Sequence, residues 1–267
     1  MPRKKSSKGW SILNGVWIVL FLGLAVFDDE LSVRKSVDRV RTTIQVVDLG
    51  TVKQPSDETS YQSTQHVWRA KGLAPYRVTF AHGHEAMSAL YAEHAYLGQS
   101  SLPSECKYRP WGCVYTEVSR LSANDLSALL DRMELVIDRS NWNARDAARW
   151  LLTFVQDIPY RIPEELAFNV LPPPLVVSED WGDCDSKSLL LLHLLKRAGI
   201  EARIFISRAH SHAMVGILLP TTGKTIRHEG REYAWAETTG RAPLGWIHPN
   251  MLKPNDWTGV DVRVTGR

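Results

Sequence analysis

A polar turn leads straight into a leucine-rich run in the stretch Trp181-Gly182-Asp183-Cys184-Asp185-Ser186-Lys187-Ser188-Leu189-Leu190-Leu191-Leu192-His193-Leu194-Leu195-Lys196-Arg197-Ala198-Gly199. The pattern predicts a helix with Asp183 as its N-cap, a broad apolar face and Gly199 as its C-terminal stop. Cys184 then lies in the first turn, where free N–H groups and the helix dipole stabilise an anion. A cysteine placed there with a cationic partner nearby has a lowered pKa and reacts as a thiolate.

The chain after this helix carries the partners that a cysteine nucleophile needs. Three predicted strands cover residues 200–206, 211–219 and 233–239. The second strand opens with His212 and the third carries Glu237. The order Cys184, His212, Glu237 suits a thiol whose proton the histidine takes, while the acid orients the imidazole. His210 would share the strand face of His212, so geometry alone leaves the choice of histidine open.

These motifs resemble the transglutaminase-like branch of the papain-type cysteine enzymes. Its bacterial members show Gly-Asp-Cys-Asp before a leucine-rich helix ending in Ala-Gly-Ile, then His-Ala-x-Val-Gly, then Glu-Thr-Thr-Gly. The matching segments of this chain are Gly182–Asp185, Leu189–Ile200, His212–Gly216 and Glu237–Gly240, and Phe154–Tyr160 is similar to the family's approach to the cysteine. The resemblance covers residues 125–250. Many members have aspartate where this chain has Glu237.

The resemblance implies an α+β fold of the papain-like type, with the catalytic cysteine at a helix N-terminus packed on an antiparallel sheet. It implies peptide or amide hydrolysis through a thioester, in which Cys184 attacks, His212 acts as base and then acid, and Glu237 orients His212. The partner would be a protein or peptide substrate, and neither a cofactor nor a metal is implied. Acyl transfer from protein glutamine to an amine shares the thioester. A non-catalytic binding domain on the same fold is the competing class.

Several side chains near these motifs have a structural as well as a functional interpretation. Asp183 and Asp185 are either metal ligands or, more simply, a cap and a solvated acid at the helix start. Trp181 and Trp235 either line the substrate cleft or belong to the core. The segment His82-Gly83-His84 is interpreted as a loop rather than a metal site.

The N-terminus predicts a membrane anchor. Residues 1–8 are basic, residues 11–27 are uncharged, and three acids follow at 28–30. The uncharged run is near the lower limit of about 17–25 residues for a spanning helix and exceeds the usual ~7–15 of a signal peptide. We expect residues 1–30 to be an uncleaved, single-pass anchor in a bacterial inner membrane. The positive-inside rule then places the catalytic domain in the periplasm. A signal peptide and a buried core helix are the alternatives.

The remaining chain has the composition of a folded domain, with 44% hydrophobic and 23% charged residues. A net charge of +3 is too small to indicate a nucleic-acid partner. We expect a stalk or N-terminal lobe over residues 31–120 and the catalytic domain over 121–267. Within the catalytic domain, helices are predicted from Ser122 to 138 and over 143–156, followed by an extended proline-rich stretch up to the cysteine turn.

Two further cysteines fit an oxidising compartment. The spacing of Cys106 and Cys113 allows a disulfide, which would leave Cys184 as the free thiol.

Overall fold

The computed structural model describes residues 46–53, 60–95, 102, 104, 106, 110–164 and 166–264. The chain divides into two compact units, residues 1–45 and 46–267, and the first lies outside the described residues. The predicted anchor therefore lies outside them too. Within the described ranges, no helix combines the length and apolarity needed to cross a membrane. The boundaries predicted at residues 30 and 120 stay a prediction.

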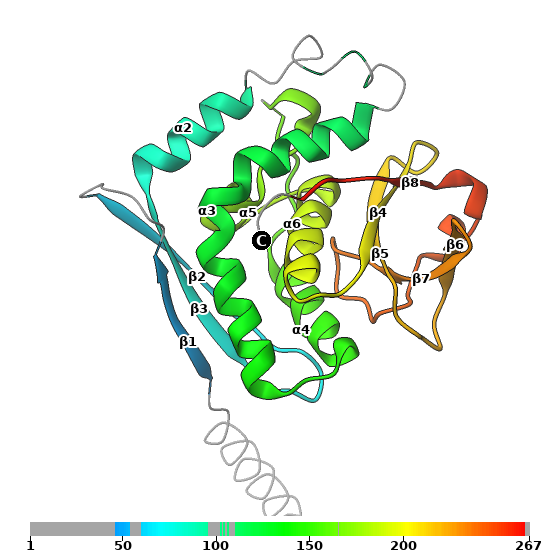
Figure 1. Ribbon diagram of the computed structural model, residues 1–267, viewed down its shortest axis with the longest axis horizontal. Helices are drawn as coiled ribbons and strands as arrows, with labels where there is room; N and C mark the ends of the chain where they lie inside the picture. The colour runs from blue at the N-terminus through cyan, green and yellow to red at the C-terminus, as the bar shows by residue number, and fades with distance from the viewer. Residues whose placement is uncertain are drawn as a thin grey trace, which may run out of the picture. The chain divides into compact units, whose positions relative to one another are not determined.

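Helix α6 (Cys184–Arg197) lies at the centre of the second unit, between a five-stranded sheet and a group of helices (Figure 1). The sheet is antiparallel, with the order β6-β7-β5-β4-β8. Its strands are β4 (Ala202–Ser207), β5 (His212–Ile217), β6 (Thr225–His228), β7 (Arg231–Ala236) and β8 (Thr258–Val260). Helix α6 contacts β4 and β5 on one side and α3, α4 and α5 on the other. The predicted α+β class is confirmed.

The ends of α6 follow from its sequence. The side chain of Asp183 accepts a hydrogen bond from the backbone N–H of Ser186 at 2.9 Å, and this caps the helix as predicted. Gly199 follows the last turn with a φ of +69°, a left-handed conformation that glycine adopts at no steric cost. The six leucines of the helix are all buried, because the sheet and the other helices cover it from both sides.

Three helices pack against α6, and their bounds test the predictions. They are α3 (Pro110–Ser140), α4 (Ala144–Asp157) and α5 (Pro173–Glu179). Helix α4 is confirmed, with Asn143 as its N-cap. The predicted helix start at Ser122 is wrong, because α3 already begins at Pro110, and Val114 and Val118 continue its buried face.

The predicted disulfide between Cys106 and Cys113 is present.

The extended conformation predicted before the cysteine turn is also wrong in part, because α5 forms there. Pro173 and Pro174 occupy its first turn, where a helix needs no N–H donor and the proline φ is already helical. The helix ends at Asp180, which has a left-handed φ of 56°. The chain then turns directly into Trp181 and the capped start of α6.

A second, three-stranded sheet holds α5 in place. The sheet has the strand order β1-β3-β2 and consists of β1 (Val47–Lys53), β2 (Tyr61–Trp68) and β3 (Tyr76–Gly83). Helix α2 (His84–Ala95) follows β3 directly. Thr64 and His66 of β2 hydrogen-bond to the backbone oxygens of Ser178 and Val177 at 2.5 and 2.8 Å. The loop predicted at residues 82–84 is wrong, since β3 runs to Gly83 and α2 starts at His84.

The remaining irregular connections contain short 3₁₀ turns at Ala167–Asn169, Pro249–Met251 and Pro254–Asp256.

Candidate active site

Cys184 is the first residue of α6 and is the unpaired cysteine of the chain, since the other two form the disulfide. Its side chain is 5% exposed. The backbone N–H of Ala213, the residue after His212, acts on the Cys184 thiol in the direction that lowers its pKa. The fold thus brings the start of β5 against the start of α6.

His212 and Glu237 form a hydrogen-bonded pair. Nε2 of His212 lies 2.9 Å from Oε2 of Glu237. His212 is the first residue of β5, and Glu237 follows the last residue of β7, the strand that pairs with β5. The other carboxylate oxygen, Oε1, accepts from the backbone N–H and the hydroxyl of Thr239 at 2.8 and 2.6 Å. Burial would raise the pKa of the Glu237 carboxyl, but the hydrogen bonds from His212 and Thr239 outweigh burial and lower it. Glu237 is therefore a fixed, ionised acceptor for the imidazole.

The structure distinguishes the two candidate histidines. His210 lies in the turn before β5, and its Nε2 pairs with Asp256 at 3.1 Å. It is therefore engaged away from Glu237. His212 is the histidine that the sheet joins to Glu237, in agreement with the His-Ala-x-Val-Gly motif.

The pKa of the Cys184 thiol shifts in the direction opposite to the prediction. Burial first, and then the charges of Asp185 and Asp183, raise the pKa of Cys184. The prediction of a lowered pKa is wrong for this state. That prediction included the effects of the helix N-terminus and of a nearby cation on the pKa. It did not include the burial of the sulfur or its hydrogen bond to Oδ2 of Asp185 at 3.4 Å. At neutral pH the resting thiol keeps its proton.

The two aspartates beside Cys184 have different partners. Asp183 caps α6, and its Oδ1 also accepts from the hydroxyl of Ser186 at 2.5 Å. Asp185 is half-buried, and it accepts a hydrogen bond from the buried hydroxyl of Tyr115. Ligand atoms of Asp183, Cys184 and Asp185 lie within 4.8 Å of one another, a spacing that suits a cation. The donors already on these carboxylates favour the structural interpretation.

Three supporting residues were missed by the sequence analysis. Tyr115 holds Asp185, as described. Gln156 of α4 donates from Nε2 to the backbone oxygens of Glu237 and Ala242 at 2.8 and 2.9 Å. Lys187 is fully buried, and its Nζ donates to the backbone oxygen of Ile158 at 2.5 Å. Only Gln156 had a sequence signal, as a polar residue at the end of an apolar helical pattern.

The segment before α5 runs beside the turn that leads into Cys184. Tyr160 forms a parallel bridge with Gly182, and the Tyr160 side chain is 52% exposed. Burial and then the charges of Cys184, Asp183, Asp185 and Glu237 raise the pKa of the Tyr160 hydroxyl.

The sequence left open whether Trp181 and Trp235 line the site or belong to the core. Trp235 is 3% exposed and belongs to the core. Trp181 is half-buried, and Cζ of Arg161 lies over its ring, 4.7 Å from the centroid.

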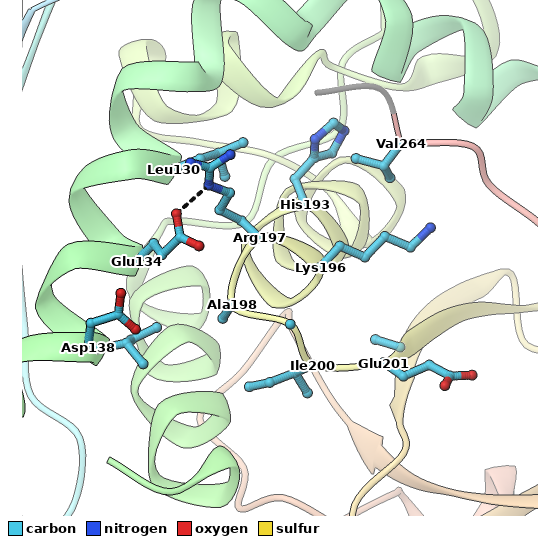
Figure 2. Close-up of a pocket in the computed structure, with 13 residues that line it drawn as sticks. Leu130, Glu134, Asp138, His193, Lys196, Arg197, Ala198, Ile200, Glu201 and Val264 are labelled. Atoms are coloured by element: carbon cyan, nitrogen blue, oxygen red, sulfur yellow. Dashed lines mark hydrogen bonds and ion pairs between the residues drawn. The ribbon is translucent and has the colours of Figure 1, made fainter. Parts of the chain in front are cut away.

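A cavity of about 670 Å³ lies at the other end of α6 (Figure 2). Its lining includes Arg197, which pairs with Glu134 and Asp131 at 2.7 and 2.6 Å, and Lys196, which donates to the Val262 backbone oxygen at 2.8 Å. The residues that line this cavity include no cysteine, serine or threonine. It is therefore a weaker candidate for covalent chemistry than the start of α6.

No protein-family model matches the chain, and no curated protein matches it. A solved structure with partial similarity is that of a candidate protease from Parabacteroides distasonis ATCC 8503, at 10% identity and a TM-score of 0.30. The similarity covers 78% of this chain and 43% of that chain, so this chain matches less than half the length of that protein. The transglutaminase-like family is not shown by these comparisons and stays a prediction from the motifs.

Proposed function

We propose that this chain is a cysteine hydrolase of the transglutaminase-like type, which cleaves peptide or amide bonds in protein or peptide substrates. The observation that carries the proposal is the hydrogen-bonded pair of His212 and Glu237, 2.9 Å apart. His212 opens β5, a strand that packs on α6, and α6 begins at the unpaired Cys184. A cysteine that served only the core would need neither partner.

The geometry suggests how the residues divide the reaction. Nε2 of His212 is committed to Glu237, so Nδ1 is the nitrogen that takes the thiol proton. The thiolate of Cys184 attacks the carbonyl carbon, and the amine leaves with the proton that His212 returns to it. Water then attacks the thioester, again with His212 as base, and the acid is released. Free backbone N–H groups at the start of α6 stabilise the oxyanion.

The resting hydrogen bond adds a step before attack. The Cys184 sulfur donates to Asp185 in this state, and burial and the two aspartates favour the protonated thiol. The sulfur must therefore exchange its acceptor, from Asp185 to His212, before it becomes nucleophilic. We expect substrate binding at Cys184 to favour this exchange.

Acyl transfer to an amine is the second candidate, since the same Cys184 thioester would serve it. Nothing in the site selects water over an amine. A non-catalytic binding domain is the third, and the buried, protonated thiol is the observation that favours it.

We further propose that residues 1–30 anchor the protein in a bacterial inner membrane with the catalytic unit in the periplasm. The charge pattern of the N-terminus supports this orientation. The Cys106–Cys113 disulfide supports an oxidising compartment. A C-terminal alkaline phosphatase fusion should be active in cells, and an inactive but intact fusion would contradict this location.

The test of the chemistry is the capture of an acyl group on Cys184. Full-length protein is mixed with a peptide ester pool, and its intact mass is followed with time. We expect an acyl adduct that is absent in Cys184→Ala and forms about 10²–10⁴ times more slowly in His212→Ala. His210→Ala is the matched control and should behave as wild type. Chasing the adduct with water or with a primary amine separates hydrolysis from transfer. Equal losses in both histidine variants, or no adduct with any ester, would favour the binding domain.

A further inference from the structure

The first turn of α6 contains a buried lysine that the proposed reaction does not use. The side chain of Lys187 is fully buried. Its stem packs against the turn before the nucleophile, because a Cβ on Gly182 would lie only 3.3 Å from Cγ of Lys187. Its Nζ donates to the backbone oxygen of Ile158 at 2.5 Å. A buried ammonium is costly unless nearby groups compensate its charge.

Contacts of neighbouring residues place Lys187 and Glu237 in one buried cluster. The next residues along the chain, Ser188 and Thr238, have their hydroxyl oxygens 3.5 Å apart. The end of α4, which accepts the hydrogen bond from Lys187, also binds the segment of Glu237. There, Nε2 of Gln156 donates to the backbone oxygen of Glu237 at 2.8 Å. The start of α6 and the acid of the site are therefore joined both directly and through α4.

The carboxylates around this cluster favour the charged form of Lys187. Burial lowers the pKa of Lys187 from 10.5 to about 8, and the negative charge of Glu237 is the largest influence that opposes this shift. The charges of Asp157 and Asp180 follow. Lys187 is therefore an ammonium at pH 7. Because an attraction between two charges acts on both, the ammonium also stabilises the ionised form of Glu237.

Glu237 is the carboxylate that needs this charge. The other two carboxylates each lie against a basic side chain, Asp157 against Arg241 at 2.5 Å and Asp180 against His66 at 3.2 Å. The carboxylate of Glu237 is instead bonded by His212, which is neutral when it acts as a base, and by Thr239. Lys187 supplies the positive charge that these two partners lack.

We propose that Lys187 is a positioning residue whose buried ammonium balances the charge of Glu237 and so keeps His212 neutral and free to take the thiol proton. Without the ammonium, the carboxylate of Glu237 would favour the imidazolium, a form that cannot act as a base. The link to catalysis rests on the proposed function. The charge balance itself does not require Cys184 to react.

The first test needs no substrate. The imidazole signals of His212 are followed across pH by NMR in full-length protein with ¹⁵N-labelled histidine, and they are assigned from their loss in His212→Ala. Lys187→Met keeps most of the stem but removes the charge. We expect His212 in this variant to take up its proton about one pH unit higher than in wild type. Lys187→Gln keeps a donor for Ile158 and should show the same shift, because it also lacks the charge.

Two further variants serve as controls. Lys187→Arg retains the charge and should titrate like wild type. Lys196→Met removes a second lysine of α6 that donates to a backbone oxygen, that of Val262 at 2.8 Å. Since Lys196 lies nine residues, or about 13 Å, further along the helix, its loss should leave the titration of His212 unchanged.

An unchanged titration of His212 in Lys187→Met and Lys187→Gln would overturn the proposal and leave Lys187 as a donor to Ile158. If Lys187→Met does not fold, Lys187→Gln decides the matter alone. An equal shift in Lys196→Met would also overturn it, because the effect would then not depend on the charge beside Glu237.

The acyl-capture assay then separates this proposal from the proposed function. At pH 6 to 7, Lys187→Met should acylate about tenfold more slowly than wild type, and the difference should close at higher pH, where His212 is neutral in both proteins. A shifted titration without acylation of Cys184 would remove the proposed function and leave the charge balance. Acylation with the same pH dependence in wild type and Lys187→Met would remove the role of Lys187 and leave the function.

Discussion

Nε2 of His212 lies 2.9 Å from Oε2 of Glu237, although 25 residues separate the two in the chain. The pairing of β5 with β7 brings them together. Thr239 occupies the second carboxylate oxygen with two hydrogen bonds, so the carboxylate cannot rotate away from the ring. The pair therefore fixes both the orientation of the imidazole and the nitrogen that is left for the thiol.

Glu237→Gln tests this arrangement with almost no change of shape. The amide cannot stabilise an imidazolium, and it can present its NH₂ to Nε2 and favour the wrong tautomer. We expect kcat to fall by about 10²–10⁴ while the melting temperature changes by only a few degrees. Asp256→Asn, which alters the His210 pair in the same way, is the matched control. A comparable fall in both variants would show that the His212 pair has no special role.

The effect of Asp185 on the thiol can be measured without a substrate. After burial, the Asp185 charge is the largest influence that raises the pKa of Cys184. Asp185→Asn removes this charge, so the pKa should fall and the thiolate fraction should rise about tenfold per unit. We expect faster alkylation of Cys184 by iodoacetamide at pH 7, followed by intact mass. Asp138→Asn, at an exposed site on α3, should label like wild type. An unchanged rate in Asp185→Asn would mean that access, not ionisation, limits the thiol.

The raised pKa of Asp183 predicts that the free energy of unfolding depends on pH. Burial and then Asp185 raise its pKa from 3.8 to about 6. The folded protein therefore holds a proton that the unfolded chain has released at intermediate pH. The stability that this group contributes is present below about pH 4 and is lost as the pH rises through about 6.

Asp183→Asn keeps a capping side chain but removes this titration. Between pH 4 and pH 7, the unfolding free energy of the variant should gain up to about 3 kcal/mol relative to wild type. Urea unfolding at a series of pH values measures the difference, with Asp138→Asn as the control. Parallel stability curves for Asp183→Asn and wild type would show that Asp183 titrates normally.

Much of the arrangement around α6 was predictable because local signals and packing agree there. Asp183, the leucines and Gly199 mark the start, the buried body and the end of one helix. Strands β5 and β7 were predictable from alternation, although β7 ends at Ala236, so Glu237 lies just beyond it and not within the strand predicted over 233–239. The order of the motifs predicted that His212 and Glu237 would meet.

What the sequence did not reveal depends on contacts between distant segments. Helix α5 is held by β2, which lies more than 100 residues earlier in the chain, and its prolines read locally as an extended stretch. The raised pKa of Cys184 needs the burial of the sulfur and the direction of the Asp185 side chain. Tyr115 belongs to a part of α3 that was not predicted to be helical, so its bond to Asp185 could not be foreseen.

Gln156 is the residue that ties α4 to the acid of the site. Its amide donates to the backbone oxygens of Glu237 and Ala242, and the side chain is 9% exposed. Gln156→Met retains the size but leaves both oxygens without this donor. We expect a loss of about 1–3 kcal/mol in the free energy of unfolding per unsatisfied oxygen.

Activity should fall further than this loss of stability explains, because Glu237 is then less firmly held against His212. The measurement is kcat well below the melting temperature, where the variant is still folded, together with its pH profile. Gln65→Met places the same substitution at an exposed position on β2 and should change neither quantity. Should Gln156→Met lose stability but keep the kcat and pH profile of wild type, Gln156 would support the fold without positioning the acid. A lowered kcat with a shifted pH profile would instead mean that the position of Glu237, and through it the ionisation of His212, depends on this amide.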